Sequence, residues 1–350
     1  MNLKTHQKEK YSLELKRTII LEAILIFAFA QSITRVHQSI WVLLFGLLLF
    51  ISLTAPIILF ANPELVKAMR KQKRFAQNLF LALICILYFL TCGYGFASGQ
   101  FNATPMAISF IWIGLCIVLL FQLPPRSPSL ISDLVFVFIL WLPSEFYLAG
   151  ALGLPAAHPV MQPFFFLAVI IVIYYIFVNR AIDPGYTFKL KGDDYRHVVL
   201  NFLLYFFIAI IISLLGGFLS VSERLPSFSH LLWQLVRILF LVAIPEELLF
   251  RGAIYRLLVM KFKGRSYAVG RALLGSSLIF ALSRANDTIG PLTDIDLAIL
   301  GVWHAPLAHM LLAAVAGIFY GLVFIRTKKI VAAALVHLGV EWMWLVFFHG

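Results

Sequence analysis

Long apolar runs separated by short polar segments make up almost the whole chain. Each run is close to the roughly 20 residues that a helix needs to cross the hydrocarbon core of a bilayer. The pattern predicts about eleven such helices, at 18–36, 39–61, 78–98, 105–122, 130–152, 159–179, 198–219, 231–255, 268–288, 308–325 and 330–348. We therefore predict an all-α fold, a polytopic bundle of membrane-spanning helices.

Basic residues alternate along this pattern. Most of the 28 Lys and Arg residues lie in every second polar segment, at 4–17, 67–74, 126, 180–196, 256–271 and 326–329. Because Lys and Arg favour cytoplasmic loops, the N-terminus is predicted to be cytoplasmic. A cleaved signal peptide is the alternative interpretation of the first run, but the alternation holds with that run retained. We expect an integral multi-pass protein of a bacterial inner membrane.

Composition excludes several classes of protein. The chain has 350 residues, of which 62% are apolar and 13% charged, which is outside the range of soluble globular and of disordered proteins. Its net charge of +12 does not indicate nucleic-acid binding, because the basic residues lie between apolar runs. Cys85, Cys92 and Cys116 lie inside such runs and are interpreted as core residues. The expected environment is a lipid bilayer, with no nucleic-acid partner.

The longest polar segment, 180–197, predicts a division of the chain. Residues 1–197 would form an N-terminal multi-span region of unknown role, serving substrate access or as a scaffold. Residues 198–350 would form a second domain, which holds most of the charges within apolar runs.

An acidic pair marks the first candidate site, because a charge at membrane depth costs a few kcal/mol and is rarely kept without a function. The run 231–255 holds Glu246 and Glu247, followed by Arg251. On a helix Glu247 and Arg251 are one turn apart and can pair, whereas Glu246 points about 100° away. We predict that Arg251 holds Glu247 and that Glu246 is free to act as a base. A purely structural ion pair is the competing interpretation.

The last apolar run supplies an imidazole. His337 and Glu341 are four residues apart and share one helix face, so the carboxylate can orient and charge the ring. At 1.5 Å per residue, Glu246 lies roughly 15 Å and His337 roughly 10 Å from the inner surface. We therefore expect both groups to converge on one polar pocket within the bilayer.

Three further ionisable residues lie nearer the outer side. Arg284 lies in the outer half of the run 268–288, about 20 Å along the helix from Arg271. His304 and His309 are five residues apart, so one straight helix would not place both on one face. We expect the two histidines in an outer loop without a catalytic role, with a metal-ligand role as the alternative.

The segment Glu246–Arg251, EELLFR, resembles the EExxxR motif of the CPBP family of intramembrane proteases, which includes type II CAAX prenyl proteases. Two further motifs of that family follow in order. Phe280 to Arg284 aligns with FxxxH, and His337 to Glu341 aligns with HxxxN. The resemblance covers about 228–348.

The resemblance implies hydrolysis of a peptide bond in a membrane-associated protein or peptide. It implies that Glu246 and the His of the second motif activate water, that Glu247 and Arg251 organise the site, and that His337 and an Asn stabilise the oxyanion. It leaves open whether a divalent metal such as zinc takes part.

Two residues depart from these motifs. Arg284 stands in place of His and cannot act as a base or a metal ligand, although it can donate to an oxyanion or clamp Glu246. Glu341 stands in place of Asn and, when ionised, only accepts hydrogen bonds. The leading hypothesis is an intramembrane endopeptidase with Glu246 as base. The alternatives are a catalytically silent family member that binds or protects a membrane protein, and a transporter with a carboxylate in its pathway.

Overall fold

The computed structural model describes residues 16, 19–27, 29, 39–122, 130–148, 151–152, 162–215, 220–221, 227–284 and 304–349. These residues are almost entirely helical; β1 (Ser220–Val221) pairs antiparallel with β2 (Phe348–His349). Six helices among the described residues are long and apolar enough to cross a membrane. The predicted all-α membrane bundle is thereby confirmed. The number of eleven spans stays a prediction.

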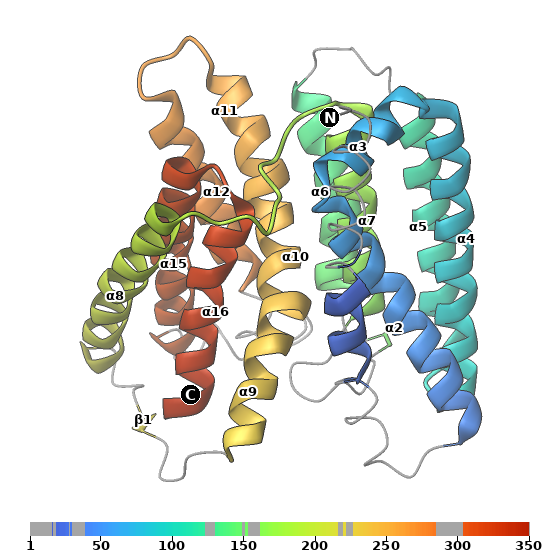
Figure 1. Ribbon diagram of the computed structural model, residues 1–350, viewed down its shortest axis with the longest axis horizontal. Helices are drawn as coiled ribbons and strands as arrows, with labels where there is room; N and C mark the ends of the chain where they lie inside the picture. The colour runs from blue at the N-terminus through green and yellow to red at the C-terminus, as the bar shows by residue number, and fades with distance from the viewer. Residues whose placement is uncertain are drawn as a thin grey trace, which may run out of the picture. The chain divides into compact units, whose positions relative to one another are not determined.

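The six long apolar helices are α2 (Ile40–Phe60), α4 (Lys73–Ser98), α5 (Ala103–Gln122), α8 (Gly192–Leu215), α15 (His304–Thr327) and α16 (Ile330–Phe347). The other helices described are α3 (Pro63–Lys71), α6 (Leu130–Phe146), α7 (Pro163–Tyr174), α9 (Phe228–Arg237), α10 (Ile244–Glu247), α11 (Arg256–Phe262) and α12 (Ala268–Ser283). Figure 1 shows their positions.

The chain divides into two compact units. One is formed by Met1–Ser127 with Phe138–Asp183, and the other by Pro128–Val137 with Pro184–Gly350. The boundary predicted between residues 197 and 198 lies inside α8. A helix can start in the polar segment that precedes an apolar run, and here Asp193 and Asp194 occupy the first turn of α8, where carboxylates are favourable. Whether the two units also differ in function stays a prediction.

The first unit is built around α7. This helix is apolar on all sides, and its residues from Phe166 to Tyr174 are all buried. Helix α2 packs on both α4 and α7. The chain continues from α7 into a π-helical turn, Tyr175–Asn179, whose Phe177 carbonyl accepts a hydrogen bond from Arg70 (2.6 Å).

A long helical segment from Phe228 to Phe262 carries the acidic pair of the second unit. It contains α9, α10 and α11, joined by the π-helical stretches Ile238–Ala243 and Leu248–Tyr255. Pro245, which lacks an N–H, lies between these two stretches. Wide helical turns of this kind are frequent at functional sites.

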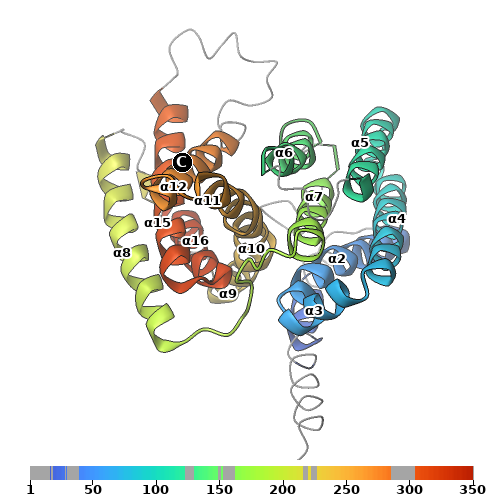
Figure 2. The same ribbon diagram turned by 90° about the horizontal axis from the view of Figure 1, so that it is seen from above.

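Close helix packing brings α12 against α15 in this unit. Gly317 of α15 makes the approach possible, because a Cβ added there would lie 3.0 Å from the Cβ of Ser277. Helix α16 contacts α8, α15, α9 and α10 and lies in the middle of the unit when it is viewed from above (Figure 2). The predicted site residues lie on or next to three helices of this unit. Glu246 and Glu247 belong to α10, Arg284 follows the end of α12, and His337 and Glu341 belong to α16.

Candidate active site

Glu247 and Arg251 form a fully buried ion pair, as their spacing predicts. Arg251 Nη1 donates to Glu247 Oε1 (3.0 Å), and both side chains are 0% exposed. The second guanidinium nitrogen donates to the carbonyl of Gly317 (2.8 Å). The guanidinium carbon also lies 5.0 Å from the ring centroid of Phe280 and 5.3 Å from that of Tyr320. Arg251 is thus fixed by a carboxylate, a carbonyl and two aromatic rings.

His337 of α16 joins this buried pair. Its Nδ1 lies 3.1 Å from Glu247 Oε1, and because an ionised carboxylate only accepts, the ring N–H is the donor. The imidazole stacks on Tyr320, with ring centroids 4.7 Å apart and planes at 16°. Its Nε2 is buried and makes no hydrogen bond with any of the residues that the structure describes. That nitrogen lies 3.8 Å from Glu246 Oε2 and 3.7 Å from Glu341 Oε1.

Glu246 is not a free carboxylate, contrary to the prediction from its position on the helix. Arg284, at the end of α12, donates to Glu246 Oε2. The guanidinium of Arg284 also lies 5.3 Å from the centroid of the Phe280 ring. The physical reason is that a carboxylate in a protein interior is stabilised by a countercharge, and α12 supplies one. The sequence left two roles open for Arg284, donor to an oxyanion and clamp on Glu246. The structure shows the contact with Glu246.

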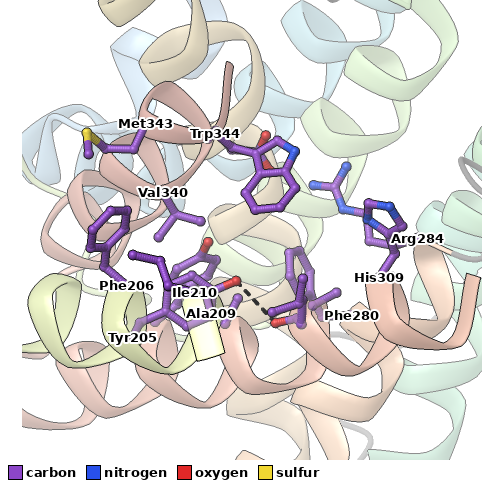
Figure 3. Close-up of a pocket in the computed structure, with 15 residues that line it drawn as sticks. Tyr205, Phe206, Ala209, Ile210, Phe280, Arg284, His309, Val340, Met343 and Trp344 are labelled. Atoms are coloured by element: carbon purple, nitrogen blue, oxygen red, sulfur yellow. Dashed lines mark hydrogen bonds between the residues drawn. The ribbon is translucent and has the colours of Figure 1, made fainter. Parts of the chain in front are cut away.

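A cavity of about 220 Å³ adjoins these groups. Its wall is largely apolar and aromatic. The residues that line it are Tyr205, Phe206, Ala209, Ile210, Phe280, Arg284, His309, Leu312, Ala313, Ala316, Tyr320, Val340, Glu341, Met343 and Trp344. Figure 3 shows aromatic side chains around the cavity, with Arg284 and His309 at one end. Glu341 and Arg284 are therefore the two oppositely charged residues of the wall, and Glu246 and His337 lie behind it.

The expectation of an outer loop for His304 and His309 was wrong, since both residues belong to α15. The helix starts four residues before the predicted run and includes Pro306 in its first turn, where a missing N–H is tolerated. His309 lies on the face of α15 that lines the cavity and makes an edge contact with Trp344 (6.5 Å between centroids). The His304 side chain lies outside the described residues.

Tyr320 is a site residue that sequence reasoning missed. It stacks on His337, contacts the Arg251 guanidinium and lines the cavity. It lies in an apolar run, and no charged residue is adjacent to it in the sequence. The two flanking glycines, Gly317 and Gly321, were the available signal, because small residues four apart mark close helix packing.

The side chains present do not fit a divalent metal. Among the described residues, no group of three or more His, Cys, Asp or Glu side chains is placed to hold a metal ion. Glu246 and Glu247 each already face a guanidinium, whose positive charge opposes a cation at the same oxygen atoms.

Comparison with known protein families identifies one match. Residues 228–343 match the family model described as type II CAAX prenyl endopeptidase Rce1-like. No curated protein and no solved structure matches the chain. The match contains Glu246, Arg284, His337 and the other predicted site residues, and it confirms the resemblance to CAAX-type proteases over this segment. It supports a protease role for an integral membrane protein that acts on a membrane-associated substrate.

Proposed function

We propose that this chain is an intramembrane endopeptidase that hydrolyses a peptide bond of a membrane-associated protein, with water activated by Glu246. The observation that carries the proposal is the convergence of α10, α12 and α16. His337 Nε2 lies 3.8 Å from Glu246 and 3.7 Å from Glu341, beside a cavity whose wall contains Arg284 and Glu341. Hydrolysis of an amide needs a base, a donor to the oxyanion and a shielded polar cavity, and these groups supply them.

Glu246 is the base in this proposal because it is the accessible member of the acidic pair. Its side chain is 13% exposed, whereas that of Glu247 is 0% exposed. Glu247 is occupied by Arg251 and by His337 Nδ1, so it serves to hold the imidazole. A water molecule bound next to Glu246 can give its proton to this carboxylate as its oxygen attacks the carbonyl carbon.

Arg284 supplies the donor to the oxyanion. A guanidinium has five N–H donors, so it can hold Glu246 with one nitrogen and donate to a developing oxyanion with another. Its side chain is 24% exposed and lines the cavity. Arg284 therefore has the stabilising role, and not the role of the base that a His at this position would have.

We also propose that the protein lies in a bacterial inner membrane with its N-terminus in the cytoplasm.

The experiment that tests the proposal compares peptide termini in membranes. Cells express the parent chain, Glu246→Ala, His337→Ala or Asp193→Asn, the last being an exposed carboxylate at the start of α8 that serves as the control. New termini of membrane proteins are then mapped by mass spectrometry. The parent and the control should share truncated products that the other two lack. Identical product sets in all four cell lines would refute the proposal.

A catalytically silent protein that binds or protects a membrane protein is the second candidate. The Arg284–Glu246 ion pair favours it, because a guanidinium next to a carboxylate stabilises the ionised form and so makes that carboxylate a weaker base. In this case the site would be a remnant, and the cavity would serve binding alone.

Arg284→His separates the two candidates. If Arg284 stabilises the oxyanion, its replacement should lower the rate of hydrolysis by about 10²-fold, the usual effect of removing one such donor. If Arg284 has no catalytic role and the FxxxH motif has only lost its His, restoring that His should create or raise peptidase activity. The measurement is the initial cleavage rate of a membrane substrate by each purified protein in proteoliposomes.

A further inference from the structure

The two residues that depart from the protease motifs are also the two oppositely charged residues of the cavity wall. Arg284 and Glu341 both line the cavity, whereas His337 does not. Arg284 can only donate hydrogen bonds. Glu341 can accept a hydrogen bond when ionised and can give up a proton when neutral, which the amide of an Asn cannot do. The substitution at 341 therefore adds a proton-transfer group to the wall of the cavity.

We propose that Glu341 is the catalytic residue that gives the proton to the leaving amine, in a reaction where Glu246 takes the proton from water. This inference rests on the proposed endopeptidase function. The two carboxylates lie close to the same imidazole nitrogen, since His337 Nε2 is 3.8 Å from Glu246 Oε2 and 3.7 Å from Glu341 Oε1. Each gap is slightly longer than a hydrogen bond, and a small side-chain rotation or one water molecule closes it.

His337 is placed to pass the proton between them. Its Nδ1–H is held by Glu247, so the lone pair of the neutral ring is on Nε2. Nε2 is buried and makes no hydrogen bond with the described residues. A buried polar atom without a partner is costly, and it is kept here beside two carboxylates that can exchange a proton with it.

The water oxygen bonds to the carbonyl carbon, its proton goes to Glu246, and the negative oxygen is held by Arg284. The proton moves from Glu246 through Nε2 of His337 to Glu341. The C–N bond then breaks as Glu341 gives that proton to the nitrogen. One water is consumed, one carboxylic acid and one amine are formed, and both glutamates regain their starting states.

The exposure of Glu341 supports a catalytic role over a purely positioning one. Glu247, which positions His337, is 0% exposed and engaged by Arg251, whereas the Glu341 side chain is 42% exposed. A carboxylate that only oriented the ring would not need an accessible surface on the cavity.

The test uses two probes that differ only in the scissile bond. One is a peptide with the sequence of a cleavage site mapped in cells, and the other is its thioester analogue, in which sulfur replaces the scissile N–H. A thiolate leaves without a proton, whereas an amine does not. Parent, Glu246→Gln, Glu341→Gln, Glu341→Asp and Asp193→Asn are compared as full-length proteins in proteoliposomes, and thermal unfolding confirms that each is folded.

Glu341→Gln should lower cleavage of the peptide by about 10²-fold or more while changing thioester cleavage by less than about threefold. Glu341→Asp keeps the proton and should retain part of the peptide activity, and Asp193→Asn should resemble the parent. Glu246→Gln should lower both rates. If it does so, and Glu341→Gln has equal effects on both probes or no effect on either, the role of Glu341 is refuted. If Glu246→Gln changes neither rate, the proposed function itself fails.

Discussion

Replacing Glu246 by glutamine is expected to lower the rate of peptide-bond hydrolysis by about 10²–10⁴-fold, the range for loss of a general base. The amide of glutamine is close in size to the carboxylate and can still accept a hydrogen bond from Arg284, the partner of Glu246. It cannot take a proton from water. Glutamine keeps the size of the side chain and the contact with Arg284, so substrate affinity should change little and the loss should fall on kcat. Initial rates at several concentrations of the mapped peptide, in proteoliposomes, measure both constants.

The matched control for this variant is Asp193→Asn, which makes the same carboxylate-to-amide change at an exposed position and should keep the parent rate. A Glu246→Gln rate within about threefold of the parent would contradict the assignment. The base would then have to be another group near the cavity.

Replacing Arg251 by methionine is expected to destabilise the protein by about 3–5 kcal/mol, the cost of leaving a buried charge without its partner. Glu247 would be left as a fully buried carboxylate, with only His337 beside it. Methionine keeps much of the side-chain volume, so the effect reports the lost charge and hydrogen bonds. Reversible unfolding of the purified protein in mixed detergent measures the free energy.

Two companion variants make this prediction specific. Arg284→Met removes a guanidinium whose ion pair is partly exposed, 24% for Arg284 and 13% for Glu246, and should cost about 1 kcal/mol or less. The double variant Glu247→Gln with Arg251→Met removes both buried charges and should recover part of the loss. Equal losses for Arg251→Met and Arg284→Met would show that the buried pair has no special role in stability.

Local spacing along the chain predicted the parts of the site that lie on single helices. The four-residue interval between Glu247 and Arg251 gave their ion pair, and the interval between His337 and Glu341 gave their approach to 3.7 Å. The depth estimate from helix rise placed Glu246 and His337 at similar depths, and the structure brings Glu246 Oε2 to 3.8 Å from His337 Nε2.

Contacts between helices far apart in sequence were beyond such reasoning. The clamp of Arg284 on Glu246 depends on how α12 and α10 pack, and two roles for Arg284 were open on the sequence alone. His309 was assigned to the outer loop although it lies at the edge of the apolar run predicted at 308–325, and a hydropathy pattern fixes such an edge only to within a few residues. The stacking of Tyr320 on His337 depends on how α15 packs against α16, and no period in the sequence encodes the register between these two helices.

The origin of the oxygen in the new C-terminus tests the central claim most directly. Parent protein and Glu246→Gln are incubated in proteoliposomes with the mapped peptide in H₂¹⁸O, and the products are weighed by mass spectrometry. The account predicts that the parent releases a product whose new carboxylate carries ¹⁸O, and that Glu246→Gln forms almost none. The same labelled product at the same rate from both proteins, or no labelled product from the parent, would contradict it.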